Sequence, residues 1–355
     1  MSTQRQFLIF GDYINAWTIQ QGLRALGLRG KCLSVESFDC LLARFGNNAV
    51  LFFTEEASWT FCAQRNLPFH FLPRPYEPVF VDKLLFSEYL CSMGETPVPF
   101  SDLAGVSDFP CVLKPRQSWK GFRKQVRGFV CFSKAEMDKA LTTLRAQQLQ
   151  EEDFFAQKLL VNADNISVSG FYDWQNPQRQ FFIATRKILG DGGWLNTGVI
   201  VETVPPPHEI GTCVARILGH LRYHGPFEME FLRDATTNQY YVLELNPRFW
   251  MQHGLFQVGY ENILLRAYID EAFHCPLPVD DDFMLAYKPL LWVDSCYPFV
   301  AISKREQRAV RLYSETIRKA RRSGYAVNFF PSWVQAFQFA LSRVARRVKR
   351  SNSRQ

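Results

Sequence analysis

The chain has 355 residues, of which 47% are hydrophobic and 21% charged, a composition that fits a globular protein of two or three lobes. No apolar run reaches the roughly 18 residues that a membrane-spanning helix needs, and the opening MSTQRQFLIFGDY does not read as a signal peptide. The nine cysteines include no C-x-x-C pair, which favours free thiols in a reducing cytoplasm over a disulfide framework or a zinc site.

The net charge of +7 is concentrated after residue 300, where 14 Lys and Arg stand against 2 Glu. This tail carries +12, so residues 1–300 carry about −5 and the body of the protein is mildly acidic. Because the body is acidic and no nucleic-acid-binding motif is present, we expect no specific nucleic-acid partner.

Residues 1–78 predict an N-terminal Rossmann-like lobe with a parallel sheet. Short apolar strands at Phe7–Phe10, Cys32–Val35 and Ala49–Phe53 accompany a helical pattern over residues 14–26. Gly11 stands alone after the first strand and does not complete a GxGxxG fingerprint, so dinucleotide binding receives little weight. The proline-rich stretch 71–78 ends this lobe.

Residues 79–153 predict a second lobe. A helix opens at Asp82, and a strand over 109–115 ends in Lys114, an anchored point charge suited to a phosphate. The basic segment QSWKGFRKQVRG at 117–128 either clamps phosphates, recruits an acidic substrate or forms a solvated hairpin surface. A further helix starts at Ser133.

Residues 154–275 predict a third lobe, with strands over 154–160, 166–172 and 180–187. Arg186 and Lys187 end the last of these strands, where they face either a phosphate, an acceptor carboxylate or solvent. A helix over 213–223 leads to the most informative stretch of the chain, GPFEMEFLRDATTNQYYVLELNPRFW at 225–250.

That stretch predicts a β-hairpin with a polar turn at 234–239. Because residues two apart on a strand share a face, Glu228 and Glu230 point the same way, as do Glu244 and Asn246. The proline that follows ends the second strand and leaves Arg248 at its mouth. Carboxylate and amide oxygens beside an arginine suit a hard divalent cation that holds phosphate oxygens.

The hairpin resembles the metal-binding end of the ATP-grasp superfamily, whose second strand carries a Glu-x-Asn-x-Arg pattern. The resemblance spans roughly residues 7–273 and implies an ATP-grasp fold, with two ATP-binding α+β lobes after the N-terminal α/β lobe. It implies Glu230, Glu244 and Asn246 as ligands of Mg²⁺ (or Mn²⁺), with Arg248 beside the transferred phosphate or an acyl phosphate. Glu228 either shares this site or is a solvated surface acid.

The same resemblance implies further contacts to ATP. Lys114 and Lys158 would reach its phosphates, and the segment from Gln157 to Leu160 would form the hinge where adenine is read. Arg186 would join Arg248 as a catalytic residue. The plainer alternative for each of these cations is a position on an exposed strand.

Within the superfamily, the hairpin looks most like the carboxylate–amine ligase branch that includes D-aspartate ligase-like enzymes. That branch implies attack of a carboxylate on ATP to give an acyl phosphate, followed by attack of an amine to give an amide. Both substrates are expected to be small molecules, held by the N-terminal lobe and loops such as Trp194–Thr197 and Phe249–His253. Two alternatives stay open: a non-catalytic ATP-binding scaffold tethered by its basic tail, and an ATP-dependent phosphotransferase.

Residues 276–355 predict a C-terminal extension with two basic helices, Lys304–Arg322 and Ser332–Arg350. Along the second, apolar residues recur every three or four positions from Phe330 to Val348. The segment 330–350 lies either on an anionic membrane or against the body or a partner. We therefore expect a cytoplasmic protein, with peripheral contact at the inner membrane surface as one alternative.

Overall fold

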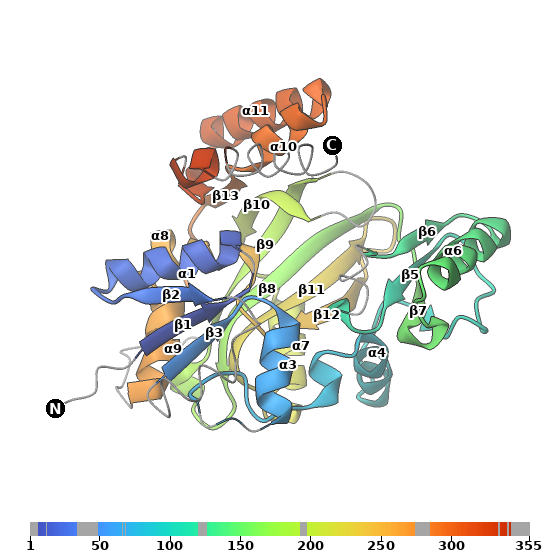
Figure 1. Ribbon diagram of the computed structural model, residues 1–355, viewed down its shortest axis with the longest axis horizontal. Helices are drawn as coiled ribbons and strands as arrows, with labels where there is room; N and C mark the ends of the chain where they lie inside the picture. The colour runs from blue at the N-terminus through green and yellow to red at the C-terminus, as the bar shows by residue number, and fades with distance from the viewer. Residues whose placement is uncertain are drawn as a thin grey trace, which may run out of the picture.

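The computed structural model describes residues 6–11, 13–33, 49–65, 67, 69–119, 126–191, 197–273, 285–332, 334–338 and 341. Three β-sheets organise these residues, and Figure 1 shows them with helices on their outer faces. Within the described ranges, every helix is too short or too polar to cross a bilayer. The centre of the basic 117–128 segment and the end of the second basic helix lie outside these ranges.

The N-terminal sheet is parallel, as its sequence pattern predicted, and has the order β2-β1-β3. Its strands are β1 (Gln6–Phe10), β2 (Gly30–Leu33) and β3 (Ala49–Phe53). All five side chains of β3 are buried. This follows from helices on both faces of the sheet, α1 (Tyr13–Ala25) on one and α3 (Glu56–Gln64) on the other.

The second sheet is antiparallel, with the order β4-β7-β5-β6. Its strands are β4 (Phe100–Ser101), β5 (Cys111–Pro115), β6 (Phe129–Cys131) and β7 (Phe154–Lys158). One face packs against α6 (Lys134–Ala146), which begins at the predicted position because the Ser133 hydroxyl accepts a hydrogen bond from the Glu136 N–H. Helix α4 (Lys83–Ser92) joins this lobe to the N-terminal sheet.

The third sheet has seven strands in the order β12-β11-β8-β9-β10-β13-β14. Its strands are β8 (Ala163–Asp173), β9 (Phe181–Gly190), β10 (Gly198–Val204), β11 (His224–Asp234), β12 (Tyr240–Asn246), β13 (Leu290–Asp294) and β14 (Ala326–Phe330). Helix α7 (His208–His220) covers one face, and α8 (Leu255–Gly259) and α9 (Ile263–Phe273) cover part of the other. The two cores beside these helices include side chains of the N-terminal sheet, so that sheet is packed directly on the third one.

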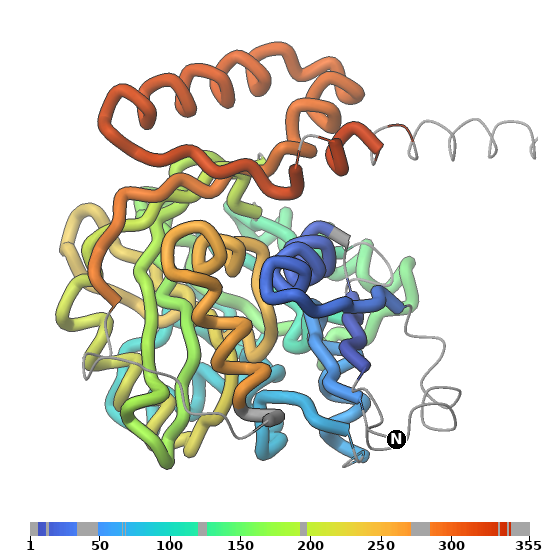
Figure 2. Tube along the Cα trace, turned by 90° about the vertical axis from the view of Figure 1, so that its left-hand side faces the viewer, coloured from blue at the N-terminus to red at the C-terminus, as the bar shows by residue number. Residues whose placement is uncertain are grey.

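Residues of the predicted C-terminal extension, 276–355, add two strands to the third sheet. Strand β13 pairs with β10, and β14 pairs in parallel with β13. The connection contains α10 (Tyr297–Ser303) and α11 (Gln307–Arg322), which lie over the end of the sheet in Figure 2. Helix α11 packs through Tyr313, Ile317 and Ala320, and its basic residues face outward.

The prediction that Phe330 opens a helical apolar stripe is wrong. Phe330 ends β14 with its side chain buried, and its ring stacks on Trp292 at a centroid distance of 6.4 Å. Spacing alone placed it on the helix, but Val327, Phe329 and Phe330 in AVNFF also favour a strand when a neighbouring strand is available. The helix begins later, and residues 334–338 and 341 of it are described.

Candidate functional site

The predicted hairpin is formed by β11 and β12, and its register sets the site. Glu230 lies opposite Glu244, and Glu228 lies opposite Asn246, so all four side chains share one face of the sheet. A register shift follows Glu230 and places an extra residue, Leu243, in β12. The alternation predicted for each strand is therefore confirmed where the acids lie.

Asn246 holds two of these carboxylates together. Its amide nitrogen donates to Glu228 at 3.0 Å and to Glu230 at 3.4 Å. The amide of Asn165 on β8 donates to the other oxygen of Glu230 at 3.0 Å. Glu228 is buried, and burial together with the nearby charge of Glu230 raises its pKa to about 8. Glu228 is thus a buried member of the cluster and not a solvated surface acid.

Lys83 reaches the cluster from the first residue of α4 and forms an ion pair with Glu244. Burial opposes both charges, but Lys83 and Lys114 together lower the pKa of Glu244 to about 2. The pKa of Lys83 is raised, because the charges of Glu244 and Glu56 outweigh the effect of its burial. Both groups are therefore charged at neutral pH.

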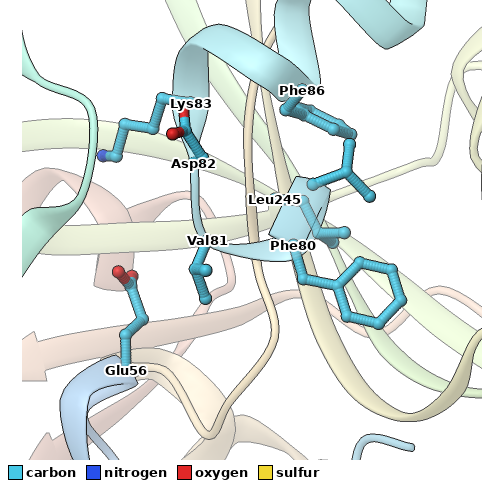
Figure 3. A pocket seen from close by; sticks show the side chains of 8 residues that line it. Glu56, Phe80, Val81, Asp82, Lys83, Phe86 and Leu245 are labelled. Atoms are coloured by element: carbon cyan, nitrogen blue, oxygen red, sulfur yellow. The ribbon is translucent and has the colours of Figure 1, made fainter. Parts of the chain in front are cut away.

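Asp82 fixes the position of Lys83, and Figure 3 shows both side chains at the start of α4. Its carboxylate accepts hydrogen bonds from N–H groups in the first turn of α4. It also accepts hydrogen bonds from two side-chain nitrogens of Arg116, at 3.0 Å and 2.8 Å. The N–H of Lys83 donates to the carbonyl of Arg116 at 2.9 Å. Since Arg116 directly follows β5, these bonds join the start of α4 to the strand that carries Lys114.

Lys114 and Gln157 lie on the face of the second sheet that is turned away from α6. Lys114 pairs with Phe155 across the strands, and Gln157 pairs with Val112, two residues before Lys114. Burial lowers the pKa of Lys114 to about 8, and Glu244 partly offsets this effect. The side chain of Gln157 is buried, and neither its oxygen nor its nitrogen has a hydrogen-bond partner among the described residues.

Arg248 joins the hairpin to the N-terminal lobe. One of its terminal nitrogens donates to the side-chain oxygen of Asn246 at 3.2 Å, and its Nε lies 3.5 Å from a carboxylate oxygen of Glu56, the first residue of α3. The backbone N–H of Phe249 donates to the carbonyl of Phe53 at 3.0 Å, which ties the segment after β12 to the end of β3. The end of the hairpin is therefore held against the N-terminal sheet.

Arg186 is not brought to this cluster. It lies on β9 opposite Glu202 and donates to that carboxylate, with a distance of 2.9 Å from its Nε. The next residue, Lys187, takes the opposite face, and its charge contributes to lowering the pKa of Lys114. Of the two cations at the end of this strand, the structure therefore brings Lys187 toward the acids.

Lys158 also lies away from the cluster. Its side chain lies on the same face of β7 as those of Phe154 and Ala156, which pack against α6. At the end of the strand, the Lys158 side chain is exposed. Its charge acts on Asp234, at the turn end of the hairpin. Leu160, the predicted end of the hinge, follows β7 and is half-buried.

The basic 117–128 segment is described only in part, and Lys120, Arg123 and Lys124 lie outside the described residues. Arg127 bridges two lobes, since it donates to the Thr197 hydroxyl at 2.8 Å and lies 3.7 Å from Asp191. This contact ties the segment to the loop after β9.

The donor set fits a divalent cation that is also bound by phosphates. Glu230, Glu244 and Asn246 supply two carboxylates and an amide oxygen on adjacent strands. No three His, Cys, Asp or Glu side chains among the described residues are arranged to hold a metal alone. The buried amide of Gln157 fits a ligand edge that carries both a donor and an acceptor, as an adenine does.

Three residues of the cluster were missed by the sequence reasoning: Lys83, Glu56 and Asn165. The Asp82-Lys83 pair at a helix start was a usable signal, because a capping Asp fixes the direction of the next side chain. Glu56 and Asn165 carried no such signal, since each reaches the hairpin from a segment distant in sequence.

No protein-family model and no curated protein matches the chain. Solved structures do match it. Pyruvate carboxylase from Rhizobium etli has a TM-score of 0.58 and 15% identity over 79% of this chain and 29% of its own. D-alanine–D-alanine ligase from Bacillus anthracis has a TM-score of 0.54 and 14% identity over 77% of this chain and 98% of its own.

A third match is the biotin carboxylase domain of Hydrogenobacter thermophilus 2-oxoglutarate carboxylase, solved with MgADP and bicarbonate. It has a TM-score of 0.55 and 14% identity, over 78% of this chain and 72% of its own. These likenesses concern the arrangement of the backbone. Together with the three sheets and their order, they show that this chain has the ATP-grasp fold.

Proposed function

We propose that the protein is an ATP- and Mg²⁺-dependent carboxylate–amine ligase that forms an amide or peptide-like bond through an acyl phosphate. The observation that carries the proposal is the meeting of Glu230, Glu244 and Asn246 with Lys83 and Lys114, which come from a different lobe. Oxygen ligands facing ammonium groups form an arrangement that can hold a metal–polyphosphate complex.

In the proposed reaction, a carboxylate oxygen attacks the γ-phosphorus of ATP, and ADP leaves with the electron pair of the broken P–O bond. The amine, after losing a proton if it arrives as an ammonium, attacks the acyl carbon through its nitrogen lone pair; inorganic phosphate leaves, and the nitrogen loses one further proton to the surroundings. Mg²⁺, when bound, neutralises phosphate charge during the first step. Glu230, Glu244 and Asn246 would hold it.

The chain's own cations contribute charge and position. Lys83 and Lys114 lie on the lobe opposite the hairpin and would neutralise phosphate oxygens. Arg248, at the end of β12, would meet the transferred phosphate. Gln157, on the same face as Lys114, would bind the adenine edge through its buried amide. This face is where we place the nucleotide.

The test is ADP release with a panel of amino acids and other small carboxylates and amines. We expect sustained release only when both a carboxylate and an amine are present, and hydroxamate formation when hydroxylamine replaces the amine. Glu244→Gln should reduce the rate by at least about 100-fold, because it removes charge that balances the metal. Undiminished ADP release in Glu244→Gln would contradict the metal site.

The same assay separates the alternatives. Phosphoryl transfer to a hydroxyl would release ADP but give no hydroxamate, because only an acyl phosphate reacts with hydroxylamine to form one. ATP binding without turnover across the panel would favour the scaffold. The D-aspartate ligase-like branch is tested by including D-aspartate in the panel.

We also propose that the C-terminal helix contacts anionic membranes. Val334, Phe337 and Leu341 follow one another at spacings of three and four residues and are 68%, 55% and 54% exposed. These apolar side chains, beside a tail rich in Lys and Arg, match a helix that lies in a membrane interface. Sedimentation with phosphatidylserine vesicles should decrease when residues 342–355 are removed, and unchanged sedimentation would contradict the contact.

A further inference from the structure

Helix α11 presents a row of cations to the outside of the molecule. Exposed charged positions recur every three or four residues along the side of the helix that is opposite its buried residues. They are Arg308, Arg311, Glu315, Arg318 and Arg322. Among the described residues, Glu315 is the only acid that forms an ion pair with this row, and it pairs with Arg311 at 2.8 Å. The other three arginines carry charge that a binding partner can neutralise.

The row lies at the outer end of the molecule and has apolar side chains beside it. Figure 1 and Figure 2, which differ by a quarter turn, both show α11 at the edge of the molecule. Leu312, one turn after Arg308, is 47% exposed, and Ile302 on α10 is 62% exposed. The surface therefore combines unpaired cations with exposed hydrocarbon.

Helix α10 joins α11 to the C-terminal helix. Its Tyr297 and Ala301 share a core with the buried side of α11. Its Phe299 packs in a small cluster with Ala336, which is the fully buried residue of the C-terminal helix. Because Ala336 faces the body, the exposed apolar stripe of that helix is turned away from the body, as the row of α11 is. Both exposed faces thus belong to one packed unit.

The distribution of charge along the chain favours an anionic bilayer as the partner of this unit. Residues after 300 carry +12, whereas residues 1–300 carry about −5. A negatively charged surface attracts the first part and repels the second, so the protein would approach it with α11 and the C-terminal helix in front. A nucleic acid would also neutralise the arginines, but it offers no apolar phase to Ile302 and Leu312.

We propose that α11 is a second membrane-binding element, whose outward arginines bind the headgroups of anionic phospholipids. Leu312 and Ile302 enter the headgroup region beside them. The inference rests on the membrane contact proposed for the C-terminal helix, and it adds to that contact a preformed basic surface on the folded body. The bilayer then lies against two helices whose positions are fixed by packing on α10.

The first test removes three charges from the row in the full-length protein, by Arg308→Gln, Arg318→Gln and Arg322→Gln together. The partition coefficient for phosphatidylserine vesicles in sedimentation should fall at least about 10-fold. Replacing the same three arginines with lysine keeps the charge and should keep binding within about 3-fold, which separates loss of charge from a folding defect. Loss of binding in the lysine variant, or unchanged binding in the glutamine variant, would overturn the proposal.

A matched control removes three charges from another exposed helix, α6, by Lys134→Gln, Lys139→Gln and Arg145→Gln. Vesicle binding of this variant should stay within about 2-fold of the wild type. A loss equal to that of the α11 variant would mean that only total charge matters, which would overturn a specific role for α11. If the α11 variant kept vesicle binding and lost binding to an oligonucleotide, the partner would be a nucleic acid and the proposal would also be overturned.

The second test separates α11 from the C-terminal helix by using the protein without residues 342–355. Because this protein keeps α11, it should still bind vesicles of phosphatidylserine alone at low ionic strength, and it should lose this binding when the three arginines are replaced by glutamine. No binding by the shortened protein, or binding that the replacement does not lower, would overturn the proposal. Unchanged sedimentation on shortening would contradict the contact of the C-terminal helix and leave the α11 result standing.

Discussion

Lys83 forms an ion pair with Glu244, and Glu244 is the residue we propose as a central metal ligand. In the nucleotide-free protein, the ammonium of Lys83 thus supplies the positive charge that a cation would supply. In the proposed site, a metal that binds the same oxygen of Glu244 would displace this lysine, while phosphates that arrive with the metal would give the lysine a new partner. The pair would then favour binding of metal and nucleotide together.

Lys83→Met should consequently bind Mn²⁺ more tightly than the wild type when no nucleotide is present. Removing the competing ammonium should increase the affinity about 10-fold, equivalent to about 1.4 kcal/mol, and electron paramagnetic resonance of free Mn²⁺ measures it. The same variant should lose ADP-producing activity. The exposed Lys139→Met on α6 serves as the control, and unchanged or weaker Mn²⁺ binding in Lys83→Met would contradict competition.

The two cations at the end of β9 should behave differently when replaced. Lys187→Met should lower kcat by about 10-fold or more, because its charge lies near Lys114 and the acids. Arg186→Met should affect mainly stability, since it leaves Glu202 without its hydrogen-bonded partner. Steady-state kinetics and urea unfolding of both variants measure the contrast. A larger kinetic loss for Arg186→Met would show that it moves into the site on binding.

Gln157→Leu should affect the empty and the loaded protein in opposite directions. Replacing a buried amide that lacks partners should stabilise the nucleotide-free protein by about 1 kcal/mol. The same change should weaken ATP binding about 10-fold, because the amide is the group proposed to bind adenine. Thermal unfolding and calorimetric titration measure the two effects. Unaltered ATP affinity in Gln157→Leu would contradict the proposal that Gln157 binds the nucleotide.

Glu228 should make stability depend on pH in Mg²⁺-free buffer. Its pKa is about 8 in the folded protein and near 4.5 when unfolded, so between these values the folded state binds the proton more tightly. The free energy of unfolding should therefore fall as pH rises from about 4.5 to 8, by up to a few kcal/mol. Glu228→Gln should lack this component and be the more stable protein at pH 9.

Urea titrations of wild type and Glu228→Gln at pH 5 and pH 9 measure the difference, and other titrating groups cancel in the comparison. Glu77→Gln, at an exposed position, should track the wild type at both pH values. If the free energies of unfolding of wild type and Glu228→Gln changed equally with pH, the raised pKa of Glu228 in the folded protein would be contradicted.

Local patterns were enough for the elements that carry the site. The hairpin was predictable because alternation of side chains is a property of each strand, and the Glu244-x-Asn246 spacing alone places both on one face. The parallel N-terminal sheet was predictable from the order of apolar strands and helix along the chain, and the start of α6 was predictable from its capping serine. In the hairpin strands and at the start of α6, the determining interactions lie within a few residues of one another.

The sequence could not decide which cations meet the acids. Arg186 and Lys187 are adjacent, and only the register of β9 against its neighbours shows that Lys187 is on the acidic face. Lys158 seemed equivalent to Lys114, but the packing of β7 on α6 turns it outward. Phe330 fitted a helical stripe until pairing with β13 made it a strand residue.

By itself, then, the sequence determined the hairpin, the shared face of its oxygen-bearing side chains and the class of fold, because these depend on short-range periodicity and on residue type. Only the tertiary structure decided that Lys83 pairs with Glu244 and that Glu56 faces Arg248. Those contacts join residues more than 150 positions apart, and they depend on how three sheets pack, which no local pattern encodes.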